Sequence, residues 1–368
     1  MNFEAWNSEI SKLKSIFLKT LGLKIPVFQA PMAGGATTPK LVAAVSNAGG
    51  LGSFAGGYAT SKQLLENIKE IKKLTDKPFS VNLFIPAKST PSNNKYERIN
   101  ALLNVYRSEL GISQQPLMPF LDDPFEEKIS IIISEKVPVF SFTFGIPSQP
   151  ILKKLKSQNI ITIGTCTTVN EGLEIEKAGC DAVVGQGSDA GGHRGTFLGS
   201  FDSAYIGTMS LIPQLTSKLQ IPVIAAGGIM DGRGIVASLA LGASAVQMGT
   251  SFLTCSESGI NQTYKNAILA STEESTVITP VFSGKPARGI KNRFIEEMKN
   301  HINDILDYPI QNYLTQDIRL KAAQLNNSEL LSLWAGQGTR LNRVQNVSTL
   351  LDEIEKEIQS TIKMISLN

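Results

Sequence analysis

The sequence has few of the residues from which disulfide-rich or metal-binding proteins are built. Its 368 residues include only three cysteines and two histidines. Cys166, Cys180 and Cys255 form no CxxC pair and have no metal-type spacing to histidine, so we expect neither a disulfide scaffold nor a metal site. The cysteines are therefore expected to be reduced thiols.

Long apolar runs and a dominant charge are missing as well. No stretch approaches 18 uninterrupted apolar residues, so no membrane span is predicted. Segment 1–24 mixes acidic and apolar residues, which predicts an amphipathic helix rather than a signal peptide, and we expect a cytoplasmic protein. The net charge is only +3 and no long basic run occurs, which argues against a nucleic-acid partner.

The 42% of hydrophobic residues form a pattern of alternating strands and helices. Short apolar, β-branched segments are separated by helical patterns, which is typical of a parallel sheet buried on both faces. Eight such units predict an α/β protein with a (β/α)8 TIM barrel, and an open doubly wound sheet is the alternative. The predicted strands are 26–32, 51–55, 79–85, 137–144, 160–166, 182–186, 222–226 and 245–249.

Two regions depart from this regular pattern. The connection 86–136 after the third strand is long and contains Pro, Asn and Ser clusters with at least one helix, so we interpret it as an insertion that covers the barrel. From about residue 255 onward the pattern is mainly helical. We therefore predict a barrel in residues 1–255 and a smaller, mainly helical C-terminal subdomain in 256–368 that contributes to the wall of the functional site.

Glycine pairs follow the seventh and eighth predicted strands. In a TIM barrel the functional site lies at these carboxyl ends, where the βα loops converge. Gly227-Gly228 precedes Asp231 and a helix, and Gly249-Thr250 follows the next strand. Backbone N–H groups and a helix N-terminus at this place favour a phosphate, although each glycine pair alone could merely permit a tight turn.

Polar amides interrupt three strands that are otherwise apolar. Asn82, Gln186 and Gln247 each need a partner, because a buried unpaired amide costs about 1–3 kcal/mol. A ligand with donors and acceptors, such as an isoalloxazine edge or a ribityl chain, would satisfy all three. Hydrogen bonding to the local backbone is the alternative.

His193 is the candidate catalytic residue. It lies among Gly191, Gly192 and Gly195 at the end of the sixth strand, where a histidine is accessible to substrate and titrates near neutrality. His301 lies in a charged helical segment and is expected to be solvated. Neither a GxSxG elbow nor a GxGxxG after the first strand is present, so neither an α/β-hydrolase nor a Rossmann site is supported.

Seven blocks of the chain, in order, resemble the nitronate monooxygenases, formerly called 2-nitropropane dioxygenases. The most specific is 186–197, QGSDAGGHRGTF, although Asp189 stands where glutamate is expected more often; the carboxylate is retained. The resemblance spans about residues 25–295. The blocks are 29–52, 77–84, 142–147, 186–197, 222–234, 245–253 and 284–294.

The resemblance implies a barrel that holds FMN noncovalently and has His193 in its active site. It places Ala30, Pro31 and Met32 near the flavin ring. The other FMN contacts that it implies are Asn82, Gln186, Gly191, Gly228, Gln247, Gly249 and Thr250.

The implied reaction converts an alkyl nitronate and O2 into a carbonyl compound and nitrite, with propionate 3-nitronate as the favoured substrate. A nitronate is already an anion, so His193 would stabilise negative charge rather than act as an obligatory base. Two alternatives stay open: an FMN-dependent enoyl-acyl carrier protein reductase that uses NAD(P)H, and a cofactor-free, phosphate-binding barrel lyase or isomerase. The expected partners are small molecules, without nucleic acid or membrane, and the sequence leaves a homo-oligomer open.

Overall fold

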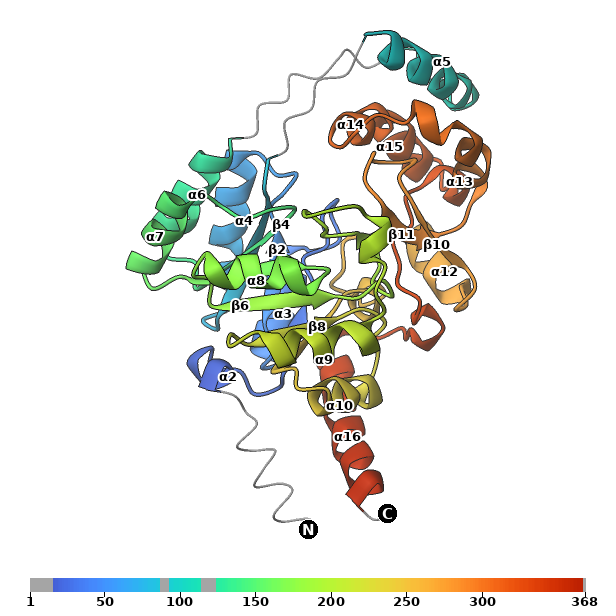
Figure 1. Cartoon of the computed structure of the whole chain (residues 1–368). Coiled ribbons are helices and arrows are strands. Elements are labelled where there is room, and N and C mark those ends of the chain that lie inside the picture. Colours follow the sequence, from blue (N-terminus) through green and yellow to red (C-terminus); the bar gives the residue numbers. More distant parts are fainter. Residues whose placement is uncertain (1–15, 87–92, 114–123, 367–368) are drawn as a thin grey trace.

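The computed structural model describes residues 16–86, 93–113 and 124–366 (Figure 1). Most of the helix predicted in 1–24 lies outside these ranges. Its last part corresponds to α2 (Ile16–Thr20), at the same end of the molecule as the chain termini (Figure 1). In these ranges, no helix has the length and apolar character that crossing a membrane requires.

Eight parallel strands form a barrel, as predicted. Their order is β1-β9-β8-β6-β5-β4-β3-β2, and a parallel bridge between Phe28 and Leu51 joins the two ends of the sheet. The alternative of an open doubly wound sheet is therefore wrong. The strands are β1 (Val27–Gln29), β2 (Gly52–Ala55), β3 (Phe79–Phe84), β4 (Val139–Thr143), β5 (Ile161–Cys166), β6 (Ala182–Gln186), β8 (Val223–Ala226) and β9 (Ala245–Met248).

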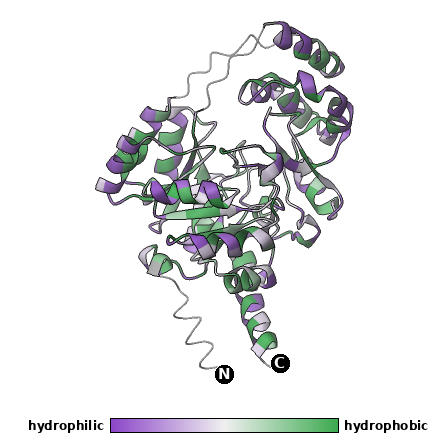
Figure 2. Ribbon diagram, viewed as in Figure 1, coloured by the Kyte–Doolittle hydropathy of each residue, from purple (hydrophilic) through white to green (hydrophobic). Residues whose placement is uncertain are grey.

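Amphipathic helices cover the outside of the barrel, with a hydrophobic and a hydrophilic face on several of them (Figure 2). Side-chain caps define where some of them begin: Thr38 starts α3, and Thr60 and Gln63 form a capping box at α4. The helices are α3 (Pro39–Asn47), α4 (Ser61–Leu74), α6 (Phe125–Ser134), α7 (Gln149–Ser157), α8 (Val169–Lys177), α9 (Thr208–Lys218), α10 (Gly232–Ala240) and α16 (Val347–Ser366).

The last helix returns to the barrel. α16 packs against α10 and α3, although its residues fall in the range that the sequence assigns to the C-terminal subdomain (Figure 1). Glu357 of α16 accepts a hydrogen bond from the backbone N–H of Gly232 at 2.9 Å, at the first residue of α10. By its contacts with α10 and α3, α16 takes the place of the eighth barrel helix, although the second layer separates it from β9 in the sequence.

The chain between β9 and α16 forms a second layer with its own apolar cluster, which includes Phe282, Phe294 and Ile318. A three-stranded antiparallel sheet, in the order β10-β11-β7, joins this layer to the barrel loops. The division at residue 255 stays a prediction. The helices and strands of this layer are α11 (Thr250–Leu253), α12 (Gln262–Ala270), β10 (Thr276–Thr279), β11 (Ala287–Ile290), α13 (Arg293–Met298), α14 (Ile310–Leu314) and α15 (Gln316–Gln324), and its 3-10 turns are Lys299–Asp304, Ser328–Leu330 and Thr339–Leu341. β7 (Gly192–His193) and the 3-10 turn Asp202–Ala204 belong to the barrel segment between β6 and α9.

The insertion after β3 contributes α5 (Asn93–Glu109), which lies beside α13–α15 rather than on the barrel (Figure 1). Arg107 of α5 is only 2% exposed. Its guanidinium donates to the carboxylate of Asp317 at 2.8 Å and to the carbonyl of Leu314 at 2.7 Å. A buried charge with these partners fixes α5 to the helices α14 and α15.

We predict that Arg107→Met loosens α5 from this layer. The loss of charge-assisted hydrogen bonds should lower the free energy of unfolding by about 1–3 kcal/mol and speed proteolysis between residues 86 and 124. Arg98→Met is the matched control on the same helix, because Arg98 is 66% exposed and lies 3.4 Å from Asp304. Equal protease sensitivity in the two variants would contradict this role of Arg107.

Candidate active site

A cavity of about 1110 Å³ lies over the carboxyl ends of the barrel strands. Its walls come from the strand-end loops and from the C-terminal layer, which contributes Tyr308, Arg319 and Trp334. In the insertion, Pro86, Pro124 and Lys128 reach the cavity, whereas no residue of α5 lines it. The structure places all the predicted site residues in this one wall: Ala30, Pro31, Met32, Asn82, Gln186, Gly191, His193, Gly228, Gln247, Gly249 and Thr250.

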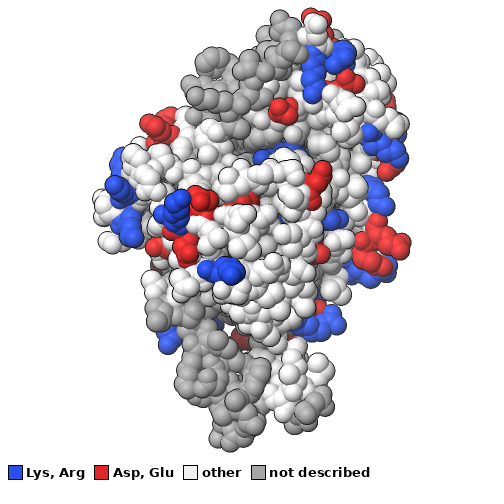
Figure 3. All heavy atoms as spheres, viewed as in Figure 1, with Lys and Arg blue, Asp and Glu red and all other residues white. Residues whose placement is uncertain are grey.

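The charges around the cavity have one sign. Lys128 and Arg319 are the charged residues in the described part of its lining, which contains no aspartate or glutamate. Such a wall favours anionic ligands. The outer surface differs: on the face shown in Figure 3, basic and acidic side chains are interspersed rather than gathered in one large basic patch. The described residues also contain no group of three His, Cys, Asp or Glu side chains that could hold a metal ion.

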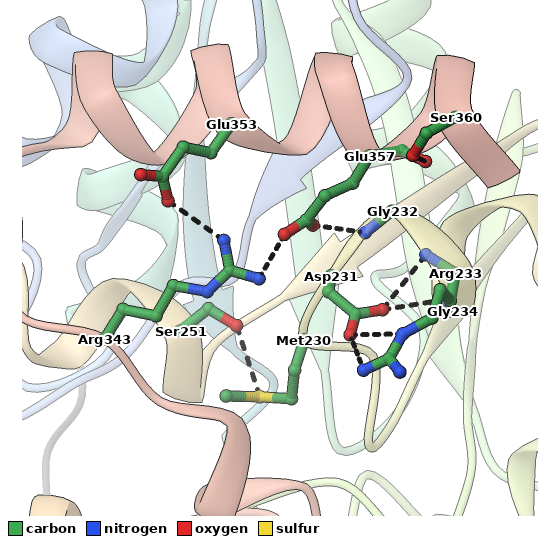
Figure 4. A network of polar contacts seen from close by, with 10 residues as sticks. All are labelled: Met230, Asp231, Gly232, Arg233, Gly234, Ser251, Arg343, Glu353, Glu357 and Ser360. Carbon is green, nitrogen blue, oxygen red and sulfur yellow. Dashed lines mark hydrogen bonds and ion pairs between the residues drawn. The ribbon is translucent and has the colours of Figure 1, made fainter.

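The loops after β8 and β9 contribute glycines and backbone N–H groups, but only one of the two helices that they precede has a free N-terminus. At α10, the Asp231 carboxylate accepts from the N–H groups of Arg233 and Gly234, and Glu357 accepts from that of Gly232 (Figure 4). The expectation that the helix after Asp231 meets an anion is therefore wrong, because carboxylates already occupy its donors.

The short helix α11 differs from α10. Its N-cap is Gly249, which has no side-chain cap. Gly228 lines the same part of the cavity with φ of +67°, a conformation that strains other residues. A phosphate would therefore meet the backbone of Gly228 and the start of α11 rather than α10.

The loop from Gln186 to Gly195 presents His193. The side-chain amide of Gln186 donates to the carbonyl of His193 at 3.0 Å and accepts from the N–H of Gly195 at 2.8 Å. At Gly191, an added Cβ would come within 2.6 Å of the backbone of Ala335 and Gly336, so only glycine fits against this segment. The loop is therefore shaped by its own amide and by close backbone contact.

These hydrogen bonds correct one prediction about the three strand amides. Gln186 has backbone partners for one amide N–H and for its oxygen, so it does not need a ligand to be satisfied, and its contact with FMN stays a prediction. Asn82 donates to Ser141 Oγ at 3.0 Å, but its side-chain oxygen has no hydrogen-bond partner among the described residues. In the same part of the chain, the amide of Gln247 has no hydrogen-bond partner, although it lines the cavity. A ligand would therefore complete the hydrogen bonding of Asn82 and Gln247.

Two arginines and an aspartate hold the same loop from behind. The fully buried Arg194 donates to the carbonyls of Gly187 at 2.6 Å and Ala204 at 2.9 Å, so it is a loop anchor and not a part of the cavity wall. Arg288 of β11 donates to the carbonyl of Ser188 at 2.9 Å. The Asp189 carboxylate accepts from the N–H and hydroxyl of Thr208, both at 2.7 Å, which positions the start of α9.

His193 itself forms part of β7, which pairs with β11. Its Nε2 lies 2.9 Å from Ser283 Oγ. The ring is surrounded by aromatic groups, with ring-centroid distances of 6.0 Å to Phe144, 6.0 Å to Tyr308 and 5.4 Å to Trp334. Sequence reasoning missed these neighbours, because they come from β4, from the segment before α14 and from the segment before α16.

Phe144 has a backbone conformation that bulky residues rarely adopt, with φ of +77°. Its ring packs against Phe84 at a centroid distance of 4.7 Å and lies under the ammonium group of Lys285 at 4.5 Å. Strained residues of this kind concentrate at functional sites. The one available signal in the sequence was the motif 142–147, in which glycine follows Phe144 directly.

The surroundings of His193 keep its imidazole neutral. Burial lowers its pKa to about 3, and the positive charges of Lys285 and Arg319 act in the same direction. Burial likewise lowers the pKa of Lys285 to about 8. The expectation that His193 titrates near neutrality is therefore wrong for the protein without a bound anion. Neutral imidazole can donate one hydrogen bond and accept another.

A closed parallel barrel with a large cavity at the carboxyl ends of its strands, and no acidic residue in the described part of the cavity lining, is typical of (β/α)8 enzymes. The model of the family described as nitronate monooxygenase matches residues 14–357. A Staphylococcus haemolyticus protein named "Probable nitronate monooxygenase" is 47% identical over 349 residues, which cover 94% of this chain and 98% of that protein. This chain therefore belongs to the nitronate monooxygenase family.

Solved structures agree with this assignment. Nitroalkane oxidase from Streptomyces ansochromogenes superposes with a TM-score of 0.88 at 37% identity, covering 95% of this chain and 99% of that one. FabK from Thermotoga maritima gives a TM-score of 0.75 at 30% identity, covering 94% and 96%. Both similarities extend over the barrel and the C-terminal layer.

The depressed pKa of His193 predicts an effect of pH on stability. In the unfolded chain His193 binds a proton near pH 6.5, whereas in the folded protein it does so only near pH 3. Between these values the unfolded state binds more protons, so lowering the pH destabilises the fold. Between pH 7.5 and pH 5, we expect the protonation of His193 to lower the free energy of unfolding by about 2 kcal/mol. His193→Gln should abolish this part of the pH dependence.

The measurement is the free energy of unfolding in urea at both pH values. His301→Gln is the comparison variant, because the His301 side chain is 40% exposed and lies outside the cavity lining. If His193→Gln and the wild type lose the same stability on acidification, His193 is not the buried neutral group described above.

Proposed function

We propose that the protein is an FMN-dependent nitronate monooxygenase that converts an alkyl nitronate and O2 into a carbonyl compound and nitrite. Propionate 3-nitronate is the proposed substrate. The observation that carries this proposal is the cavity itself, which brings His193, an aromatic wall and two cations together without an acidic residue. A nitronate arrives with its negative charge already formed, so cations and a hydrogen-bond donor beside it would stabilise it.

The described residues fit FMN. Gly228, Gly249 and the uncapped start of α11 provide backbone donors for a phosphate. The unpaired amide of Gln247 provides both a donor and an acceptor for a polar edge. The glycine φ of +67° at Gly228 allows close approach of a ligand. An FAD would also need a place for an adenosine, for which the sequence carries no fingerprint.

FMN would supply the redox chemistry, by accepting electrons from the substrate and passing them to O2. The protein would supply position and electrostatic stabilisation. His193 Nε2 lies 2.9 Å from Ser283 Oγ, whose hydroxyl also has the carbonyl of Lys285 as an acceptor at 3.1 Å. When the hydroxyl turns from that carbonyl to Nε2, Nδ1 carries the hydrogen of the ring. That N–H can donate to a nitronate oxygen and stabilise its negative charge.

A general-base role of His193 is less suitable. An imidazole with a pKa of about 3 has little affinity for a substrate proton. The enzyme should therefore act on preformed nitronates much better than on neutral nitroalkanes. Two other observations separate the proposal from its alternatives. An enoyl-acyl carrier protein reductase would consume NAD(P)H, and a cofactor-free lyase or isomerase would show no flavin absorption.

We predict that Gly249→Ala lowers the FMN content of the purified protein. Its φ is −112°, and an added Cβ would meet Ala30 and Met32 at 3.5 and 3.6 Å, so the chain itself tolerates alanine. Crowding should therefore affect the ligand and not the fold. The measurement is the flavin released by heat, identified by co-migration with FMN, per mole of protein. Gly207→Ala is the control with unchanged occupancy, because Gly207 lies outside the cavity lining, has φ of −65°, and an added Cβ would come no closer than 3.8 Å to Asp189.

Release of FAD from the wild type would contradict the proposed cofactor. Full FMN occupancy in Gly249→Ala would contradict the proposed phosphate position.

We predict that His193→Ala retains FMN but loses about 10²–10³-fold in kcat/KM for propionate 3-nitronate, because one preorganised donor is removed. His193→Asn, which can still donate a hydrogen bond, should retain more activity. The measurement is rapid-mixing reduction of the flavin by nitronate without oxygen, with flavin content determined in parallel. Near-wild-type reduction in His193→Ala would leave the proposed role of this residue without support.

A further inference from the structure

Arg319 of α15 lines the cavity and leaves part of its hydrogen-bonding capacity unused. Its Nε donates to the carbonyl and the hydroxyl of Thr315 at 3.3 and 3.2 Å, and its Nη2 donates to the carbonyl and the side-chain oxygen of Asn312 at 2.6 and 3.0 Å. Among the residues that the structure describes, Nη1 has no hydrogen-bond partner. The guanidinium is thus oriented by α14 and still has two N–H donors left.

No carboxylate neutralises this guanidinium. Asp317 lies two positions away in the sequence, but its carboxylate is bound by Arg107 at 2.8 Å. Within residues 16–86, 93–113 and 124–366, neither aspartate nor glutamate lines the cavity. Burial lowers the pKa of Arg319, and Tyr58 and Asp317 partly oppose this effect. A buried cation is costly unless a partner compensates it, so a bound anion would stabilise Arg319.

Arg319 also lies close to the proposed reaction centre. Its positive charge adds to the burial that lowers the pKa of His193, and it opposes the burial that raises the pKa of Tyr58. Tyr58 follows β2 and packs its ring against Phe84 at 5.4 Å, whereas the proposed phosphate loops follow β8 and β9. The cavity therefore has a second anion-attracting region, separate from the phosphate position and adjacent to His193.

The other cation of the cavity is less suited to receive a ligand. Lys128 is 3% exposed, and its ammonium group lies 3.4 Å from the carbonyl of Gly57. Arg319, by contrast, presents a planar donor group to the cavity. The free Nη1 of Arg319 can donate a charge-assisted hydrogen bond to an oxygen of a carboxylate.

We propose that Arg319 binds a carboxylate at the end of the substrate remote from its nitronate group, and so determines selectivity for nitronates with a second negative charge. The inference rests on the proposed function, because it takes the nitronate end to lie at His193. It assigns to Arg319 a specificity role that is independent of electron transfer.

The test compares two nitronates of equal chain length, propionate 3-nitronate and propyl-1-nitronate, in the wild type, Arg319→Gln and Arg319→Lys. With Arg319→Gln, kcat/KM for the carboxylated substrate should fall about 10- to 100-fold, mainly through KM, because charge-assisted hydrogen bonds are lost. For the neutral-tailed substrate the fall should be several-fold smaller, because only the general positive potential of the cavity is reduced. Arg319→Lys should rescue part of the loss, since it retains the charge without the planar fork.

A second measurement does not depend on turnover. Succinate is a four-carbon dianion of similar length, and calorimetry on the FMN-loaded protein should show that its binding weakens about 10-fold or more in Arg319→Gln. Thermal midpoints report whether the α14 contacts of Arg319 matter for folding, and the propyl-1-nitronate rate corrects for any such effect.

The outcomes separate the two proposals. Equal losses for both nitronates together with unchanged succinate affinity would overturn the role of Arg319, while the proposed function would stand. Succinate binding that depends on Arg319 in a protein that oxidises neither nitronate would support the anion site and overturn the proposed function.

Discussion

The position of His193 depends on the hydrogen bonds that hold the loop between β6 and β7. Gln186 joins the two ends of the loop, and Arg194 binds its carbonyls from the buried side. Arg288 ties the loop to β11, which in turn pairs with β7. Because these contacts use backbone groups, the imidazole is placed by the fold before any ligand arrives. Preorganisation of this kind is what makes a single donor effective in catalysis.

The distribution of charge is the second constraint. Acidic residues near the site are turned away from the cavity: Asp189 positions α9, Asp231 and Glu357 cap α10, and Asp317 binds Arg107. The carboxylates therefore stabilise the framework, while the cavity keeps its positive potential. Burial keeps the imidazole of His193 neutral, and the positive charges of Lys285 and Arg319 act in the same direction.

Local patterns in the sequence predicted most of the barrel. Near-continuous apolar segments defined all eight strands, and the glycines around His193 defined the loop that carries it. What could not be predicted depends on contacts between distant segments. The pairing of β7 with β11, the return of α16 to α10, and the approach of Tyr308 and Arg319 to the cavity have no periodic signature. For the same reason Gln186 was assigned to a ligand, because its partners lie seven and nine residues further along a loop of irregular shape.

The cavity, the family membership and the proposed FMN site lead to one central claim, that the protein oxidises nitronates with O2 and without a nicotinamide cofactor. The most direct measurement is nitrite release from propionate 3-nitronate in air, with and without NADH. Our account predicts release at the same rate in both conditions, with oxygen consumed and a carbonyl product formed. Release that requires NADH, or NADH oxidation without any nitrite, would contradict it.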